Sequence, residues 1–145
     1  MRIHGIGDDQ ADRMNRAQKL LENVGLDATA LNRYPKDFSG GQRQRIGIAK
    51  AIAIGPELII CDESVSALDV SVQAQVLNLL NELKQNHGFG FLFISHDLSV
   101  VYHMSDRLMV LEHGHLLELD NADIVYETPK SAYTQRLIQA IPTMD

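Results

Sequence analysis

The sequence has one cysteine, no long apolar segment and no excess of positive charge. Cys61 is the only cysteine in 145 residues, so no internal disulfide can form and a reducing compartment suits the chain. No apolar run approaches the ~20 residues of a membrane-spanning helix, and the start does not resemble a signal peptide. A net charge of −6 argues against a general nucleic-acid or lipid surface. We therefore expect any membrane attachment to come through a partner protein.

The sequence also lacks the motif Gly-x-x-x-x-Gly-Lys-Ser/Thr. In that motif the backbone cradles nucleotide phosphates, and the lysine reaches the β and γ groups. None of the lysines in this chain follows a glycine. Length and hydrophobic content (45%) are otherwise ordinary for one globular domain.

A helix start is the most informative feature that is present. Ser39 is a natural N-cap, and Gln42 stands three residues later, as in a capping box. Gly40 and Gly41 put no side chains over the first turn, so its N–H groups are open to an anion such as phosphate. At this point a phosphate site and a plain glycine-containing helix start are equally open. The apolar positions predict a helix that ends at Gly55-Pro56.

A short strand with an acidic end follows this helix. Residues 57–63 read as a strand buried on both faces, with Asp62 and Glu63 at its carboxyl end. Asp62 can hold Mg²⁺, and Glu63 can orient or deprotonate a water that attacks a phosphate. Two adjacent acids at a strand end are also common in simple turns, which is the alternative.

The next segments predict a strand-helix-strand unit. Residues 66–69 form a loop before a helix that ends near His87-Gly88, with one apolar stripe made of Val72, Val76, Leu79, Leu80 and Leu83. Residues 89–94 read as a second buried strand, which delivers His96 to the same sheet edge as Asp62 and Glu63 if the strands are parallel. His96 could hydrogen-bond a γ-phosphate, although a lone histidine after a strand is more often structural.

The remaining chain predicts ordinary elements. Residues 9–24 form an amphipathic helix that Gly25 terminates, with the inward positions Met14, Ala17, Leu20, Leu21 and Val24. Residues 107–112 and 115–119 read as a hairpin, and residues 122–126 and 131–140 as short helices, the second ending before Pro142. His113 and His115 flank the hairpin turn but lack the further ligands of a metal site.

Taken together, these motifs resemble the nucleotide-binding domains of ABC transporters. The matching segments are the signature motif (Ser39, Gly40, Gly41, Gln42), the Walker B strand (58–62), the catalytic glutamate (Glu63), the D-loop (Ser66, Ala67, Leu68, Asp69) and the H-loop (His96). The sequences of residues 33–46, 65–75 and 121–142 resemble those of the branch that serves dipeptide and oligopeptide importers. Nickel and glutathione importers share much of the same sequence pattern.

The resemblance implies an α/β fold, the C-terminal part of a P-loop NTPase (RecA-like) domain with parallel strands and flanking helices. Residues 1–55 would be part of the helical subdomain with the signature helix, and residues 56–145 part of the core. It implies ATP and Mg²⁺ as cofactors, with Asp62 as the metal ligand. It also implies a second ABC ATPase subunit, membrane-spanning permease subunits and, indirectly, an extracytoplasmic substrate-binding protein, at the cytoplasmic face of a prokaryotic cell membrane. The signature residues would contact the partner's ATP, whereas Glu63 and His96 would serve a nucleotide on this subunit.

Several departures from the family pattern are visible. Ser64 follows the glutamate where proline or alanine is usual, and Lys50 stands in place of arginine. Many relatives have a cysteine cluster after the final proline, but none follows Pro142 here. Because the P-loop is absent, we expect a fragment with negligible ATPase activity, with an exposed apolar sheet edge and marginal stability or self-association. A non-transport ABC-type ATPase and a non-catalytic interaction module remain alternative functions.

Overall fold

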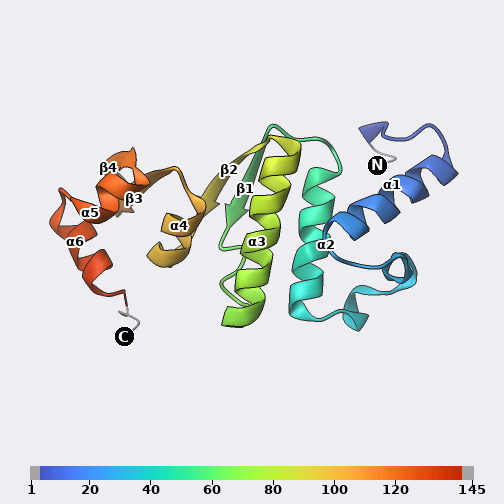
Figure 1. The fold of residues 1–145 in the computed structure, drawn as a ribbon, viewed down its shortest axis with the longest axis horizontal. Coiled ribbons are helices and arrows are strands. Elements are labelled where there is room, and N and C mark those ends of the chain that lie inside the picture. The colour runs from blue at the N-terminus through green and yellow to red at the C-terminus, as the bar shows by residue number, and fades with distance from the viewer. Residues whose placement is uncertain (1–3, 142–145) are drawn as a thin grey trace. The chain divides into compact units, whose positions relative to one another are not determined.

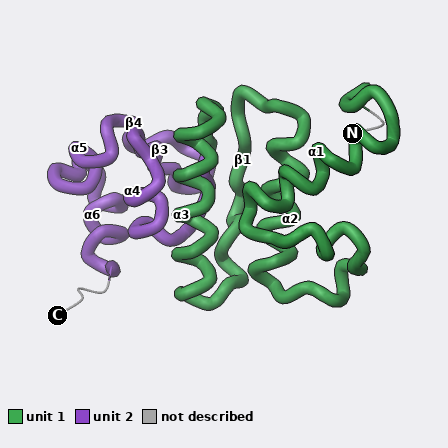
Figure 2. The backbone as a smooth tube through the Cα atoms, turned by 45° about the vertical axis from the view of Figure 1, so that its right-hand side comes forward, with its two compact units in different colours: residues 1–92 green, residues 93–145 purple. Residues whose placement is uncertain are grey.

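The computed structural model describes residues 4–141. The chain divides into two compact units, residues 1–92 and residues 93–145 (Figure 2). The boundary between the units falls within the second strand. Each unit has its own helices and its own buried residues.

The first unit begins with the predicted amphipathic helix. Helix α1 (Gln10–Asn23) starts at Asp9, whose carboxylate accepts a hydrogen bond from the Asp12 N–H at 2.8 Å. The chain turns away at Gly25, which adopts a left-handed φ of 72° that glycine tolerates best. The short 3₁₀ helices η2 (Ala28–Asn32) and η3 (Pro35–Asp37) then lead to the next long helix.

One predicted inward residue of α1 was wrong. Met14 is 46% exposed, and the buried residues of this segment lie at its C-terminal end, at Leu21 and Val24. Met14 has the helical spacing of the stripe that contains Leu21 and Val24. Only the C-terminal end of this segment packs against enough of the chain to be buried, so Met14 stays exposed.

The central elements of this unit follow the predicted order. They are α2 (Gly40–Ile52), β1 (Leu58–Asp62), α3 (Val70–His87) and β2 (Gly90–Ile94) (Figure 1). Strands β1 and β2 are hydrogen-bonded neighbours and point the same way, as a strand-helix-strand crossover requires. Helix α3 ends at Gly88 in a left-handed conformation, and four of its five predicted stripe residues are buried.

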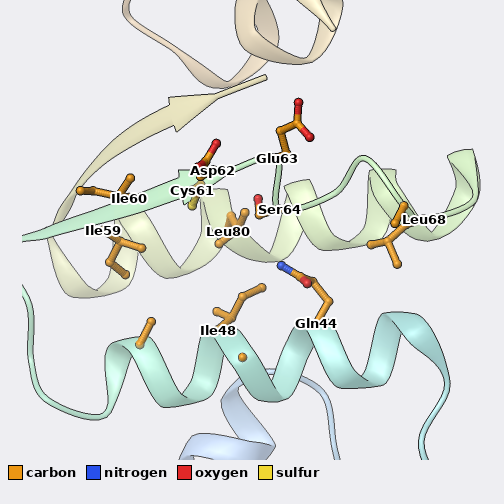
Figure 3. A pocket seen from close by; sticks show the side chains of 13 residues that line it. Gln44, Ile48, Ile59, Ile60, Cys61, Asp62, Glu63, Ser64, Leu68 and Leu80 are labelled. Carbon is orange, nitrogen blue, oxygen red and sulfur yellow. The ribbon is translucent and has the colours of Figure 1, made fainter. Parts of the chain in front are cut away.

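The predicted burial of the strands on both faces was wrong. Ile59 and Cys61 of β1 face the helices, and Cys61 is buried, but Leu58 and Ile60 are 56% and 62% exposed. Leu92 of β2 is also exposed, and alternation from Gly90, which lies beside Leu58, puts it on the same face. Helices α2 and α3 cover one face of this sheet, and no part of residues 4–92 buries the other (Figure 3). We call Leu58, Ile60 and Leu92 the open face.

The second unit holds a hairpin with a separate core. Its elements are α4 (Leu98–Met104), β3 (Arg107–Glu112), β4 (His115–Asn121), α5 (Ala122–Glu127) and α6 (Ala132–Gln139). Strands β3 and β4 pair antiparallel with a bulge between Val110 and Leu111, which confirms the predicted hairpin. Leu108, Val110, Ala122 and Val125 form the core of this unit. Both C-terminal helices match the prediction, while the expected stop at Pro142 lies outside the described residues.

Candidate functional site

The turn that opens α2 is an exposed, fully capped helix start. The Gln42 N–H donates to Ser39 Oγ at 3.2 Å, and the Ser39 N–H donates to Gln42 Oε1 at 3.1 Å. This reciprocal pair is the capping box that the sequence predicted. Ser39 and Gly40 are exposed, so the positive end of the helix faces outward. The turn can therefore receive an anion without a rearrangement of its cap.

The glycines of this turn also have a packing role that the sequence did not reveal. A Cβ placed on Gly41 would lie 2.5 Å from Val72 Cγ1, and one on Gly40 would lie 3.6 Å from Leu68 Cδ2. The start of α2 thus contacts both the 66–69 loop and the first turn of α3. Nothing in the sequence except the glycine itself signals that Val72 lies there.

The two predicted carboxylates stand together at the end of β1. Asp62 is the last residue of the strand, and Glu63 follows in a left-handed conformation with φ of 45°. Both side chains are exposed and point away from α2 (Figure 3). The Glu63 carbonyl accepts hydrogen bonds from the Ser66 N–H at 3.2 Å and from Ser66 Oγ at 2.9 Å. These bonds tie the acidic turn to the 66–69 loop.

A cavity of about 500 Å³ lies between α2 and the acidic turn. Gln44 and Ile48 enter it from α2, and Leu80 enters it from α3 (Figure 3). Cys61 lines the same cavity, and burial raises the pKa of its thiol. The Ser64 hydroxyl oxygen is buried in the wall beside this thiol, and its contact with the thiol partly offsets the effect of burial on the Cys61 pKa.

The predicted histidine lies in the second unit. His96 follows β2 in a short turn, in which the Asp97 N–H donates to Ser95 Oγ at 3.0 Å. Asp97 then caps α4 by accepting from the Ser99 N–H at 3.0 Å. The structure thus brings together the signature turn, the D-loop and the acidic turn within the first unit, and holds His96 in a capped turn of the second.

Two features of residues 4–141 bear on metal and membrane binding. No group of three or more His, Cys, Asp or Glu side chains in this range is arranged to hold a metal ion. No helix in the same range is long and apolar enough to cross a membrane. Asp62 alone still suits Mg²⁺, because this ion usually takes one or two carboxylates and completes its shell with phosphate oxygens and water.

Comparison with known sequences identifies relatives of this chain. Residues 3–66 match the family described as ABC transporter. The oligopeptide transport ATP-binding protein OppF of Bacillus subtilis is 54% identical over 143 residues, covering 99% of this chain and 47% of that relative. A putative peptide import ATP-binding protein of Brucella ovis is 51% identical over 145 residues, covering 100% of this chain and 45% of that relative. The chain spans about half the length of the curated relatives it matches.

Solved structures show the same fold. A putative metal-chelate type ABC transporter in an inward-facing conformation has a TM-score of 0.77 at 27% identity, over 93% of this chain and 51% of that chain. The ADP conformation of an ATP-binding cassette of an ABC transporter has a TM-score of 0.74 at 24% identity, over 94% and 53% of the two chains, and supports the fold alone. These likenesses confirm the predicted α/β class. With about half of its residues identical to those curated relatives over nearly the whole sequence, the chain belongs to the ABC transporter family.

Proposed function

We propose that this chain is part of the ATP-hydrolysing subunit of an ABC importer, and that the cargo is a dipeptide or oligopeptide. The observation that carries the proposal is the contact between the exposed turn Ser39–Gln42 and the loop that leads from Glu63. The peptide cargo is supported by 54% identity to an oligopeptide transport ATP-binding protein. Nickel and glutathione remain the alternative cargoes.

The signature turn contacts a nucleotide that another subunit holds. A helix start with open N–H groups favours a phosphate, and the capping box between Ser39 and Gln42 leaves the N–H groups of Gly40 and Gly41 outside its two hydrogen bonds. The sequence has no Gly-x-x-x-x-Gly-Lys-Ser/Thr motif that could hold a nucleotide on this chain. In the ABC transporter family, which this chain resembles, two nucleotide-binding domains pair head to tail. On that resemblance we assign the γ-phosphate that Ser39, Gly40 and Gly41 contact to the ATP of a second ABC ATPase subunit.

The acidic turn and the histidine serve the hydrolytic chemistry. Asp62 would hold Mg²⁺, which supplies charge neutralisation to the phosphates when bound. Glu63 orients or deprotonates the attacking water, because its carboxylate is exposed directly after the strand end. His96 donates a hydrogen bond to the γ-phosphate and responds to its loss. Ser66–Asp69 is the D-loop.

The assembly follows from these roles. We assign residues 1–55 to part of the helical subdomain with the signature helix, and residues 56–145 to part of the catalytic core. The partners are a second ABC ATPase subunit and membrane-spanning permease subunits, and an extracytoplasmic binding protein delivers the cargo to the permease. The chain works at the cytoplasmic face of the cell membrane through these partners.

Two measurements test the proposal. The purified chain should hydrolyse ATP at a rate no higher than that of its Glu63→Gln variant, because it lacks the lysine and the backbone cradle that position the phosphates. Turnover that falls on Glu63→Gln would overturn the expected inactivity. The tagged chain, co-expressed with the permease subunits of a peptide importer, should co-purify with them from membranes. Recovery without any permease subunit would argue against the transporter assignment.

A further inference from the structure

The close approach of α2 and α3 depends on one glycine. The Cβ position of Gly41 lies 2.5 Å from Val72 Cγ1, far inside the ~3.5–4.0 Å at which carbon atoms make favourable contact. Gly47, in the middle of the same helix, has no atom within 4 Å of its Cβ position. The steric demand is therefore specific to the phosphate-facing turn and is not a property of α2 as a whole.

Neighbouring contacts continue the same interface along both helices. Leu68 Cδ2 lies 3.6 Å from the Cβ position of Gly40, and Arg45 Nη2 donates to Gln75 Oε1 at 3.2 Å. The contacts advance together, from residue 40 to residue 45 on α2 and from Leu68 in the D-loop to Gln75 on α3, as expected for two helices that lie side by side (Figure 1). Arg45 also donates to the Val24 carbonyl at 3.1 Å, which connects α1 to this interface.

We propose that Val72 is a positioning residue for the phosphate-facing turn Ser39–Gln42. Its side chain occupies the space that Gly41 leaves open, and so sets the distance between the start of α2 and the D-loop. The D-loop is bonded in turn to the Glu63 carbonyl through Ser66. A displacement of the signature turn by a bound phosphate would thus reach the acidic turn through Val72 and the D-loop. This inference rests on the proposed function, because it assigns a role toward the same nucleotide contact.

A double-mutant cycle on the isolated chain tests the contact without any nucleotide. Gly41→Ala should lower the folding equilibrium constant at least about tenfold, because the added methyl group overpacks the contact with Val72. In a Val72→Ala background the same change should lower it less than about threefold, because the space is then available. Equal costs in the two backgrounds would overturn the proposal.

Matched controls exist for both positions. Gly47→Ala lies in the same helix with open space at its Cβ, and should raise the folding constant about fivefold through helix propensity. Val70→Ala removes a side chain that is 84% exposed and should leave the constant unchanged. A Gly41→Ala effect as harmless as that of Gly47→Ala would also overturn the proposal.

A second measurement distinguishes a positioning role from an effect on stability, and it does not require the Gly41→Ala chain to fold. In nuclear magnetic resonance spectra, Val72→Ala should shift the backbone amides of residues 39–42, whereas Val70→Ala should not. Val72→Thr keeps a methyl group at the γ position and should leave these amides near their original positions. Unshifted amides in Val72→Ala would contradict the positioning role.

Inorganic pyrophosphate then links the contact to its function. Titration should move the amides of residues 39–42 in the unmodified chain, and Val72→Ala should weaken that binding several-fold. Equal pyrophosphate affinities of the unmodified and Val72→Ala chains would overturn the positioning role. If the mutant cycle gives the expected result but pyrophosphate causes no shift, the Val72 contact stands and the phosphate role proposed for the turn is refuted. Failure of the Val72 contact and failure of the phosphate role are therefore distinguishable.

Discussion

Two adjacent residues of the acidic turn carry unusual local features. Glu63 has a positive φ, which a residue with a side chain adopts at some cost in conformational energy. The buried hydroxyl of Ser64 has a weakly hydrogen-bonding thiol, that of Cys61, beside it, whereas the hydroxyl of Ser66 donates to the Glu63 carbonyl. Ser66 therefore supports the turn more strongly than Ser64 does.

This contrast predicts opposite effects of two serine-to-alanine changes. Ser64→Ala should raise the free energy of unfolding by about 1 kcal/mol, because it removes a buried hydroxyl whose neighbouring thiol is a weak hydrogen-bonding partner. Ser66→Ala should lower it by about 0.5 kcal/mol, because it removes a hydrogen bond at an exposed site. Urea unfolding followed by circular dichroism measures both, and a loss of stability in Ser64→Ala equal to that in Ser66→Ala would refute the assignment.

The single thiol should report on unfolding. Burial of Cys61 raises its pKa, so the reactive thiolate is scarce and inaccessible in the folded chain. We expect slow labelling by an aromatic disulfide reagent in buffer and rapid labelling in urea. The unfolded thiol ionises before the folded one. The contribution of Cys61 to stability is therefore constant below the usual thiol pKa of about 8.5 and declines as the pH rises above it.

An accessible thiol on the same chain provides the control for this labelling. A Cys61→Ala chain that carries Ser71→Cys, at an exposed position of α3, should react quickly in buffer and in urea alike. Native Cys61 that reacts as fast as this control would show that the strand is not protected.

At the scale of elements, β1 has two unlike faces. Cys61 faces the cavity that α2 and α3 enclose, where Leu80 is only 1% exposed. Ile60, one residue earlier, points to the open face. The strand is anchored from one side, so substitutions on its two sides should differ sharply in their effect on stability.

Two truncations to alanine test this asymmetry. Leu80→Ala should lower the free energy of unfolding by about 3 kcal/mol, because it creates a cavity under the sheet. Ile60→Ala should lower it by less than about 1 kcal/mol, because the side chain is already mostly in water. Both are measured by urea unfolding. A cost of Ile60→Ala close to that of Leu80→Ala would mean that another surface covers the open face.

At the scale of the whole molecule, two surfaces favour association: the apolar side chains of the open face and the edges of its sheet. Leu58, Ile60 and Leu92 form an apolar surface on a sheet that has two strands among the described residues. Such a sheet exposes hydrogen-bonding edges as well as apolar side chains, and both promote association. The chain spans about half the length of its curated relatives.

We therefore expect the isolated chain to self-associate through the open face. In sedimentation velocity experiments the average mass should rise with concentration, and Ile60→Lys should reduce this rise by placing a charge on the face. Val70→Lys adds the same charge at an exposed position of α3, outside the open face, and should not reduce the rise. A monomer with a reversible melting transition at every concentration would contradict this expectation.

Local signals predicted the secondary structure well. The capping box at Ser39, the glycine at position 88 and the apolar stripe of α3 depend on residues a few positions apart, so the sequence carries them directly. The hairpin of the second unit was equally readable from its turn at His113-Gly114. The candidate site residues were found by motif, because their order along the chain is itself the signal.

Burial and packing partners could not be read in the same way. An apolar run such as residues 58–60 indicates that a strand can be buried. Whether both of its faces are covered depends on which other elements pack against the sheet. Met14 fits the stripe of α1 and is still exposed for the same reason.

The sequence by itself determined the helix caps and the order of the motifs, because each of these depends only on residues near one another in the chain. The tertiary structure alone decided that Gly41 must lack a side chain, that Val72 fills the space it leaves and that β1 has an open face. The physical reason is that steric contact and burial arise between segments distant in sequence, whose distances are fixed only when the helices pack.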